Sequence, residues 1–214
     1  MTPSNDPKPV VYIVDDDHSV RAALQDLFAS VTLDAMAFSS IREFLEHPRT
    51  AGAACLVLDV RMPAQSGMDF YLQMDSLGLR MPVIFITGHG DIAMGVRAIK
   101  DGAVDFLTKP FRDHDLLDAV HTAIARDQQR LHQEEIHSEL QRRWESLNTG
   151  ERDVLRLVVR GLLNKQIAAE LSVKEITVKV RRARVMQKMQ AASFADLVRM
   201  ADQLELGAET RRNS

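Results

Sequence analysis

The sequence is poor in the residues on which disulfide-rich, fibrous and membrane-spanning proteins depend. It has one cysteine, Cys55, which excludes a disulfide framework and a cysteine zinc cluster. Ten glycines and seven prolines are too few for a fibrous or disordered chain of 214 residues. No apolar run approaches the ~18 residues of a membrane span, and the first residues, MTPSNDPKPV, lack the apolar stretch of a signal peptide. We therefore expect a cytoplasmic protein without a membrane segment.

The net charge of −3 is distributed unevenly along the chain. Residues 1–125 carry a net charge of −7, residues 126–146 a net charge of −1, and residues 147–214 a net charge of +5. An acidic front and a basic back predict two domains with different partners, of which the basic one is a candidate for binding nucleic acid.

The front half alternates short apolar runs with segments of helical periodicity. Three runs are continuously apolar, as expected of parallel strands that are covered on both faces, and two weaker strands accompany them. The strands are expected at 10–14, 33–38, 54–60, 82–87 and 104–107. Helices are expected around 20–28, 41–46, 68–76 and 92–100, and from 113 onward. This alternation predicts a parallel sheet with helices on both faces.

The back half is expected to be entirely helical. There is no glycine or proline between Pro110 and Gly150, so the last helix of the front domain is expected to continue almost to residue 147. Its apolar residues have a rough heptad spacing that fades at Ser138, which favours a long helical linker over a self-sufficient coiled coil. The heptad-spaced residues are Leu117, Val120, Ile124 and Leu131. Four shorter helices are expected at about 149–160, 164–171, 175–189 and 193–204, the first opened by a capping box of Asn148 and Glu151.

Polar side chains stand where four of the expected strands end. They are Asp15, Asp16 and Asp17 after the first strand, Asp59 after the third, Thr87 after the fourth and Lys109 after the fifth. The carboxyl ends of parallel strands share one edge of a sheet, which is where ligands bind. Neighbouring carboxylates repel unless a cation lies among them, and Mg²⁺ favours oxygen ligands and phosphate. These residues predict a site where a carboxylate attacks a phosphoryl group and holds it as phosphoaspartate.

A purely structural interpretation explains each acid taken singly. The acids at 15–17 would form a solvated turn that caps the next helix, and Asp59 would simply end a strand. It does not explain why complementary groups stand at four strand ends, so we favour the phosphoaspartate site.

Four segments of the front half resemble the receiver domain of two-component response regulators. They are IVDDDHSVR at 13–21, LVLDVRMPAQSGMDF at 56–70, ITGHGD at 86–91 and GAVDFLTKPF at 102–111. The resemblance covers about residues 10–125. It implies a flavodoxin-like α/β fold with a five-stranded parallel sheet in the order 2-1-3-4-5, and a phosphoryl group transferred to Asp59 from a sensor histidine kinase.

The same resemblance implies a Mg²⁺ site around Asp59. Asp59 and Asp16 would bind the ion directly, together with the backbone carbonyl of Arg61, and Asp15 would bind it through water. Asp17 lies one place beyond the acidic pair, and its role stays open.

The resemblance also implies how the site would switch. Thr87 and Lys109 would hold the phosphoryl oxygens, and the peptide bond between Lys109 and Pro110 would be cis. Thr87 would move toward the phosphoryl group while Phe106 turns inward, a role that is compatible with an ordinary core position for Phe106.

The expected helix at 175–189 has a basic outer face. If Val178, Val185 and Met189 face the core, the opposite face carries Lys179, Val180, Ala183, Arg184 and Gln187. Such a face suits the DNA major groove, because cations reach phosphates or guanine and small apolar groups reach thymine methyls. With the preceding helix and the turn at Ser172, it predicts a helix-turn-helix. A solvated charged face is the alternative, but five cations between 179 and 188 with no acid among them favour DNA.

Residues 147–201 resemble the NarL/LuxR-type four-helix output domain. The sequences TGHGD and VMQKM are similar to those of FixJ-type regulators, and the long linker helix resembles that of the StyR/TodT subset. The resemblance implies that Lys179, Val180 and Ala183 face bases. The expected phosphate contacts are Thr177, Arg181, Arg182 and Arg184, and Lys165 and Lys188 complete the DNA-binding set. Arg182 is also expected near the inner face, where it would snorkel to a phosphate or pair with an acid.

Three positions of this segment depart from the family pattern. Gly150 stands where the family usually has arginine, Lys174 takes a place often held by a capping serine, and Arg181 replaces a common histidine. These departures bear on sequence specificity more than on DNA binding itself.

The sequence therefore predicts a transcriptional response regulator rather than a dedicated enzyme. Phosphorylation of Asp59 would favour a homodimer that places two recognition helices on promoter DNA about 34 Å apart, with RNA polymerase as a further partner. A haloacid-dehalogenase-like phosphatase is an alternative, but it would need an acid at the position of Arg61. A binding module whose basic domain contacts RNA polymerase or RNA is the other. The expected divisions are a disordered tail at 1–9, a receiver at 10–125, a helical linker at 126–146, a helix-turn-helix domain at 147–206 and a flexible tail at 207–214.

Overall fold

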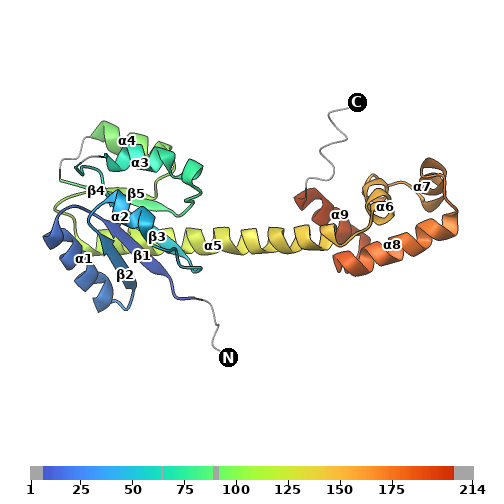
Figure 1. The fold of residues 1–214 in the computed structure, drawn as a ribbon, viewed down its shortest axis with the longest axis horizontal. Helices are drawn as coiled ribbons and strands as arrows, with labels where there is room; N and C mark the ends of the chain where they lie inside the picture. Colours follow the sequence, from blue (N-terminus) through green and yellow to red (C-terminus); the bar gives the residue numbers. More distant parts are fainter. Residues whose placement is uncertain (1–6, 64, 89–91, 205–214) are drawn as a thin grey trace. The chain divides into compact units, whose positions relative to one another are not determined.

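The computed structural model describes residues 7–63, 65–88 and 92–204. Most of the two expected tails therefore lies outside the described residues. By its internal contacts the chain divides into two compact units between Leu131 and His132, inside the segment that the sequence assigns to a linker (Figure 1). Each unit is described by itself.

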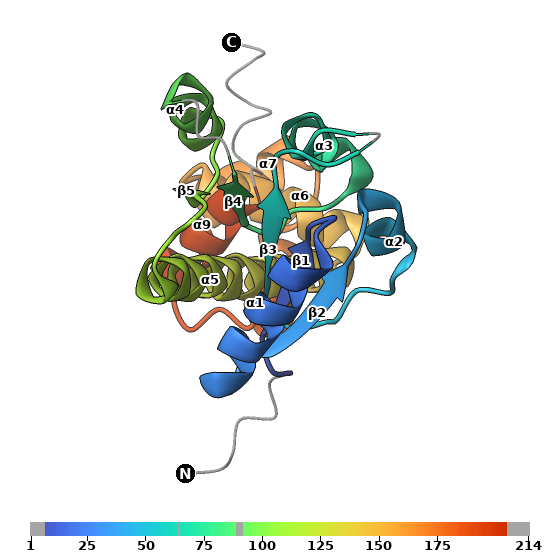
Figure 2. The same cartoon turned by 90° about the vertical axis from the view of Figure 1, so that its left-hand side faces the viewer.

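Unit 1 is built on a parallel sheet of five strands in the order β2-β1-β3-β4-β5 (Figure 2). The strands are β1 (Val10–Val14), β2 (Asp34–Phe38), β3 (Ala54–Asp59), β4 (Val83–Thr87) and β5 (Asp105–Thr108). Every residue of β1, β3 and β4 is buried, which is why their sequences are continuously apolar. The predicted fold and strand order are confirmed.

Helices cover both faces of this sheet (Figure 2). They are α1 (His18–Ser30), α2 (Ile41–Glu46), α3 (Gly67–Gln73), α4 (Ile92–Lys100) and the first part of α5 (Asp113–Glu145). Alternate residues of β1 divide between the two cores: Val11 and Ile13 pack with α1 and α5, whereas Tyr12 packs with α2 and α3. The helix expected over 68–76 is α-helical only to Gln73. It is followed by the 3₁₀ turn η1 (Asp75–Leu77), which ends at Gly78 in the left-handed region.

Helix α5 supplies side chains to the cores of both units. Its heptad-spaced residues Leu117, Val120, Ile124 and Leu131 all pack against the sheet of unit 1. Farther along the same helix, Trp144 is buried in the core of unit 2. The apolar spacing that fades at Ser138 therefore reflects packing on the sheet and not a coiled-coil seam.

Unit 2 combines the end of α5 with four helices: α6 (Thr149–Val159), α7 (Asn164–Glu170), α8 (Glu175–Met189) and α9 (Phe194–Gln203). The predicted capping box of Asn148 and Glu151 is present at the start of α6. Val178, Val185 and Met189 are buried, as the periodicity of α8 predicts. None of the helices in the described part of the chain is long and apolar enough to cross a bilayer.

A buried acid fixes α5 to the amino-terminal end of β3. The Asp127 carboxylate accepts a hydrogen bond of 2.8 Å from the backbone N–H of Ala54 and pairs with Arg130 at 2.8 Å. The neighbouring Cys55 thiol is buried, and burial, with a smaller contribution from Asp127, raises its pKa to about 12. Asp127 thus satisfies the first amide of the strand that ends in Asp59.

We predict that Asp127→Ala destabilises unit 1 by about 1–3 kcal/mol, because the buried Ala54 N–H loses its acceptor. Urea unfolding followed by circular dichroism measures this loss. Trp144 is the only tryptophan and lies in the core of unit 2, so its fluorescence transition should not shift. Asp127→Asn keeps an oxygen acceptor and is expected to lose less. Equal loss in both variants would contradict the role of this hydrogen bond.

Candidate functional site

The strand order brings the predicted acids and the predicted lysine together. Strands β1 and β3 are parallel neighbours, with Val14 beside Leu58, so Asp15 and Asp59 emerge side by side. The Lys109 ammonium, just beyond β5, lies 2.6 Å from an Asp15 oxygen and 3.0 Å from an Asp59 oxygen. Three charged groups that are distant in the sequence thus meet at the carboxyl edge of the sheet.

Asp59 is buried but well supplied with hydrogen-bond donors. One carboxylate oxygen accepts the backbone N–H of Arg61 at 3.0 Å, and the other accepts the Lys109 ammonium. Burial raises the pKa of Asp59, and the hydrogen bonds from Arg61 and Lys109 oppose this rise. Burial alone would lower the pKa of Lys109, but its hydrogen bonds to Asp15 and Asp59 outweigh burial and raise it. Lys109 therefore remains an ammonium beside the carboxylates.

The acidic cluster fits a divalent cation. One oxygen from each of Asp15, Asp16 and Asp59 lies within 4.8 Å of the others. Asp15 and Asp59 are buried, while Asp16 is exposed to solvent. Three carboxylates face one ammonium, so a hard cation among the oxygens would relieve their repulsion.

A backbone hydrogen bond joins Thr87 to Lys109. Thr87 is buried at the end of β4, and its carbonyl accepts the Lys109 N–H at 2.7 Å. The bond between Lys109 and Pro110 is cis, as the resemblance implies. Both side chains that are expected to hold phosphoryl oxygens therefore flank the same strand edge as Asp59.

Phe106 is half-buried and packs between β4 and α4. Its ring centroid lies 6.3 Å from that of Phe85. A methyl group at Gly95 of α4 would approach the ring to 3.0 Å, so Gly95 leaves the space that the ring occupies. Phe106 is thus a packed residue whose position depends on the absence of a side chain in α4.

Two residues acquire roles that the sequence left open or did not show. The Asp17 carboxylate accepts the Ser19 N–H at 2.7 Å and caps α1, and this backbone hydrogen bond lowers the pKa of Asp17. At the start of α3, a side chain on Gly67 would collide with the backbone carbonyl oxygen of Asp59. Gly67 is the single glycine of the segment LVLDVRMPAQSGMDF, which is the signal that could have identified it.

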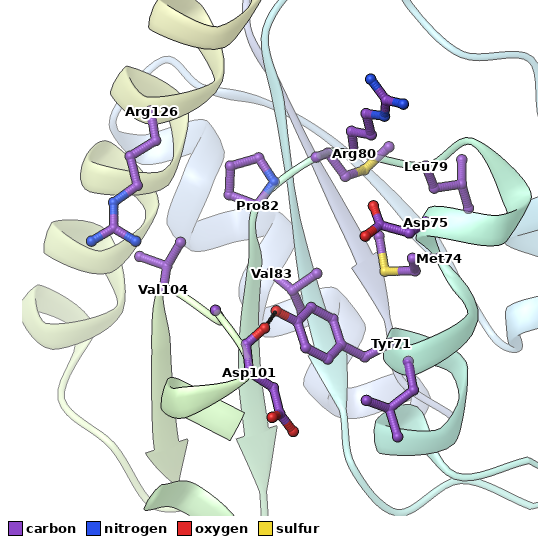
Figure 3. Close-up of a pocket in the computed structure, with 13 residues that line it drawn as sticks. Tyr71, Met74, Asp75, Leu79, Arg80, Pro82, Val83, Asp101, Val104 and Arg126 are labelled. Carbon is purple, nitrogen blue, oxygen red and sulfur yellow. Dashed lines mark hydrogen bonds between the residues drawn. The ribbon is translucent and has the colours of Figure 1, made fainter. Parts of the chain in front are cut away.

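A separate pocket of about 410 Å³ opens at the opposite, amino end of the strands. Figure 3 shows Tyr71 of α3 on its wall, where the hydroxyl donates a 2.8 Å hydrogen bond to the carbonyl of Asp101. Val83, the first residue of β4, and Val104, which directly precedes β5, also line it, together with Arg126 of α5. This pocket is distinct from the acidic cluster at the carboxyl ends.

The outer face of α8 in unit 2 carries the side chains that the sequence predicts for DNA. Lys179, Val180, Ala183 and Arg184 are exposed, and Thr177 is half-buried. Lys179 lies 3.6 Å from Glu175 in an exposed pair, which constrains it little. Lys165 of α7 is also exposed. These groups are placed where a nucleic acid could reach them.

Two arginines of α8 are held against neighbouring helices. Arg182 donates to the Asn164 side chain at 3.2 Å and lies 5.4 Å from the Phe194 ring centroid, so it joins α7 and α9 and has no acid as its partner in these contacts. The Arg181 guanidinium lies over Gly150 of α6, where a methyl group would come within 2.6 Å of its central carbon. Two positions that depart from the family pattern are therefore in contact.

Lys188, which the sequence predicts to contact DNA, is held in an ion pair within unit 2. Its ammonium donates to the Glu151 carboxylate at 2.7 Å and to the carbonyl of Ser146 at 2.9 Å. The Glu151 side chain is 2% exposed. The hydrogen bond from Lys188 lowers the pKa of Glu151, although burial opposes this. Lys188 thus neutralises a buried acid inside unit 2, so a DNA contact would have to replace this ion pair.

Sequence reasoning also missed Ile176. It lies in the first turn of α8, and its side chain is 63% exposed. At 100° per residue it falls opposite Val178, on the same face as Lys179 and Val180. The helical periodicity that selected the basic face already contained this signal.

We predict that Mg²⁺ stabilises unit 1 and that Asp16→Asn abolishes most of this effect. At a hundredfold excess over the dissociation constant, binding is expected to add about 2.7 kcal/mol. Thermal unfolding with and without Mg²⁺ measures the gain. Asp17→Asn is the matched control, because asparagine caps a helix as well as aspartate does and Asp17 lies outside the cluster. Equal loss in both variants would refute a role specific to Asp16.

We predict that Lys188→Met destabilises unit 2 by about 1–3 kcal/mol, because a buried carboxylate loses its cation. Trp144 fluorescence during urea unfolding reports this loss. The lowered pKa of Glu151 means that the ion pair stabilises unit 2 at neutral pH and that this contribution disappears as the pH falls through that pKa. Lys188→Met lacks this contribution, so the stability difference between wild type and variant should shrink as the pH falls through the pKa of Glu151.

The same variant separates a structural role of Lys188 from DNA binding. The slope of log affinity against log salt should remain that of the wild type in Lys188→Met. In the exposed control Arg184→Met it should fall by about 0.9, the loss of one phosphate contact. If Lys188→Met reduces the slope of log affinity against log salt and does not destabilise unit 2, Lys188 contacts DNA.

Two family models match the chain. The response regulator receiver domain matches residues 11–121, and the luxR family of bacterial regulatory proteins matches residues 145–201. One match lies in each of the two units that the structure defines.

Similar proteins match over nearly the whole chain. Nodulation protein W of Bradyrhizobium diazoefficiens is 50% identical over 201 residues, which are 94% of this chain and 88% of that protein. The transcriptional regulatory protein FixJ of Azorhizobium caulinodans is 42% identical over 89% of this chain and 90% of its own length. A solved structure of the response regulator StyR is 44% identical, covers 92% of this chain and all of that chain, and has a TM-score of 0.83.

Proposed function

Because the chain belongs to the two-component response regulators that combine a receiver domain with a luxR-family DNA-binding domain, we propose that a sensor histidine kinase phosphorylates it on Asp59 and that this raises its affinity for promoter DNA. The observation that carries the proposal is the convergence of Asp15, Asp59 and Lys109 within hydrogen-bond distance at the carboxyl edge of the sheet. A transcriptional regulator of this family works on DNA, so we place its action in the bacterial cytoplasm.

Asp59 is the nucleophile in this proposal. One of its carboxylate oxygens forms a bond to phosphorus as the bond between phosphorus and the kinase histidine breaks. The electron pair of the broken bond stays on that ring nitrogen, and the histidine, whose other ring nitrogen carries a proton, leaves as neutral imidazole. Asp59 and Asp16, the carbonyl of Arg61 and, through water, Asp15 would hold Mg²⁺, which would offset the charge of the phosphoryl oxygens. The Lys109 ammonium and the Thr87 hydroxyl would bind those oxygens from the side of β4 and β5.

Phosphorylation changes the charge balance that Lys109 maintains. The phosphoryl group adds about −1.5 to −2 charges next to an ammonium that already bridges Asp15 and Asp59. Lys109 and Thr87 would shift toward it, and the space vacated by Thr87 would accept Phe106. The Phe106 ring would then move away from Gly95, and this would alter the surface that α4 and β5 form.

This altered surface is where we expect a homodimer to form. A dimer would bring two α8 helices to adjacent half-sites of double-stranded DNA, with Lys179, Val180 and Ala183 toward the bases and Lys165 and Arg184 toward phosphates. Thr177, Arg181 and Arg182 lie at the border of this face, the last two held by contacts to α6 and α7. RNA polymerase bound at the same promoter is the further partner that we propose.

The site supports phosphoryl storage better than turnover of a free phosphate ester. A phosphatase of the haloacid-dehalogenase type needs an acid two residues after its nucleophile, and this chain has Arg61 there. The Arg61 N–H instead supports Asp59 as an acceptor. We therefore propose no dedicated enzymatic activity.

We predict that acetyl phosphate with Mg²⁺ adds one phosphoryl group to Asp59, as peptide mass spectrometry would show. The wild type should then bind DNA fragments recovered by genome-wide footprinting at least ~10-fold more tightly, a difference of about 1.4 kcal/mol. Asp59→Asn, the matched control, should show neither effect. An adduct on another residue, or DNA binding that ignores an adduct on Asp59, would sink the proposal.

A further inference from the structure

The outer face of α8 exposes two large apolar side chains one helical turn apart. Ile176 is 63% exposed and Val180 is 45% exposed. Neither belongs to the apolar core of unit 2, whereas Val178 between them is buried. Side chains four residues apart lie on the same face of a helix, so Ile176 and Val180 form a short apolar stripe, which Ala183 extends.

Cations border this stripe. Lys179 lies beside it, with its side chain 59% exposed, and Arg184 is exposed on the next turn. An apolar protein surface or a membrane interior would leave these cations without anionic partners. The DNA major groove offers both chemistries, because phosphates line it and the thymine methyl group is its apolar feature.

We propose that Ile176 and Val180 read thymine methyl groups, so that each operator half-site carries thymine at two positions facing the first two turns of α8. This rests on the proposed binding of α8 in the major groove. The stripe lies at the amino-terminal end of the helix, the end that contacts base edges in helix-turn-helix proteins. Four residues of helix rise by about 6 Å, and base pairs are spaced by about 3.4 Å. The two thymines are therefore expected about two base pairs apart.

The test removes single methyl groups from the DNA. The full-length wild-type protein, activated with beryllofluoride, is first used to select its preferred duplex from a random library. Each thymine of one half-site is then replaced singly by deoxyuridine, which lacks only the methyl group, and binding is measured by fluorescence anisotropy. Two replacements, about two base pairs apart, should each weaken binding by about fourfold, the ratio that ~0.8 kcal/mol for one buried methyl-sized group gives.

Alanine variants identify the residue that contacts each methyl. Ile176→Ala should bind thymine and deoxyuridine equally at one of the two positions, and Val180→Ala at the other. Leu163→Ala is the matched control: Leu163 is 70% exposed but precedes α7 instead of lying on the stripe, so this variant should keep both preferences. Because all three side chains are exposed, the thermal unfolding of the variants should match that of the wild type.

The outcomes separate this inference from the proposed function. If the activated wild type binds duplex DNA but tolerates deoxyuridine at every position, the thymine contacts are refuted and DNA binding stands. If Ile176→Ala and Val180→Ala weaken binding equally to thymine and deoxyuridine duplexes, the stripe contributes to affinity without reading the methyls, and the inference is also refuted. If these variants change transcription but not DNA affinity, the stripe contacts a protein instead. If the activated wild type selects no duplex at all, the proposed function itself fails.

Discussion

A single ammonium group, that of Lys109, holds two buried carboxylates at the edge of the sheet, and the arrangement of unit 1 depends on this. Asp15 and Asp59 would repel each other at the ends of adjacent strands without it. It joins the end of β5 to the ends of β1 and β3, and the backbone bond from Lys109 to Thr87 adds the end of β4. One cation does not balance three acids, so the cluster keeps a surplus of negative charge. That surplus of negative charge suits the binding of a divalent cation.

Much of this arrangement could be predicted from the sequence because its causes are local. Continuous apolar runs identify buried parallel strands, and the residue that ends each run marks the edge where ligands bind. The capping box of Asn148 and Glu151 and the inward face of α8 follow from spacing alone. Parallel topology then brings the ends of the strands together, which is why the acidic cluster could be predicted without coordinates.

The parts that escaped prediction depend on how distant helices pack. In the sequence, Lys188 is one of several cations on a basic helix. Only the packing of α6 against α8 shows that its ammonium pairs with the carboxylate of Glu151, which lies 37 residues away. Gly67 is required because α3 begins against the backbone of Asp59. Gly150 and Arg181 appear in the sequence as two unrelated departures from the family pattern. In the structure they form one contact, in which the missing side chain of the first makes room for the guanidinium of the second.

The continuity of α5 limits how the two halves of such proteins can be exchanged during evolution. Because Trp144 is buried among the helices of unit 2 while Leu116 and Val120 are buried under the sheet of unit 1, the helix belongs to both modules. Recombination that joined a foreign receiver at residue 147 would discard the tryptophan on which the output module packs. A viable crossover would have to fall within the exposed stretch of α5 at 132–138, and it would have to preserve the helical phase across the junction.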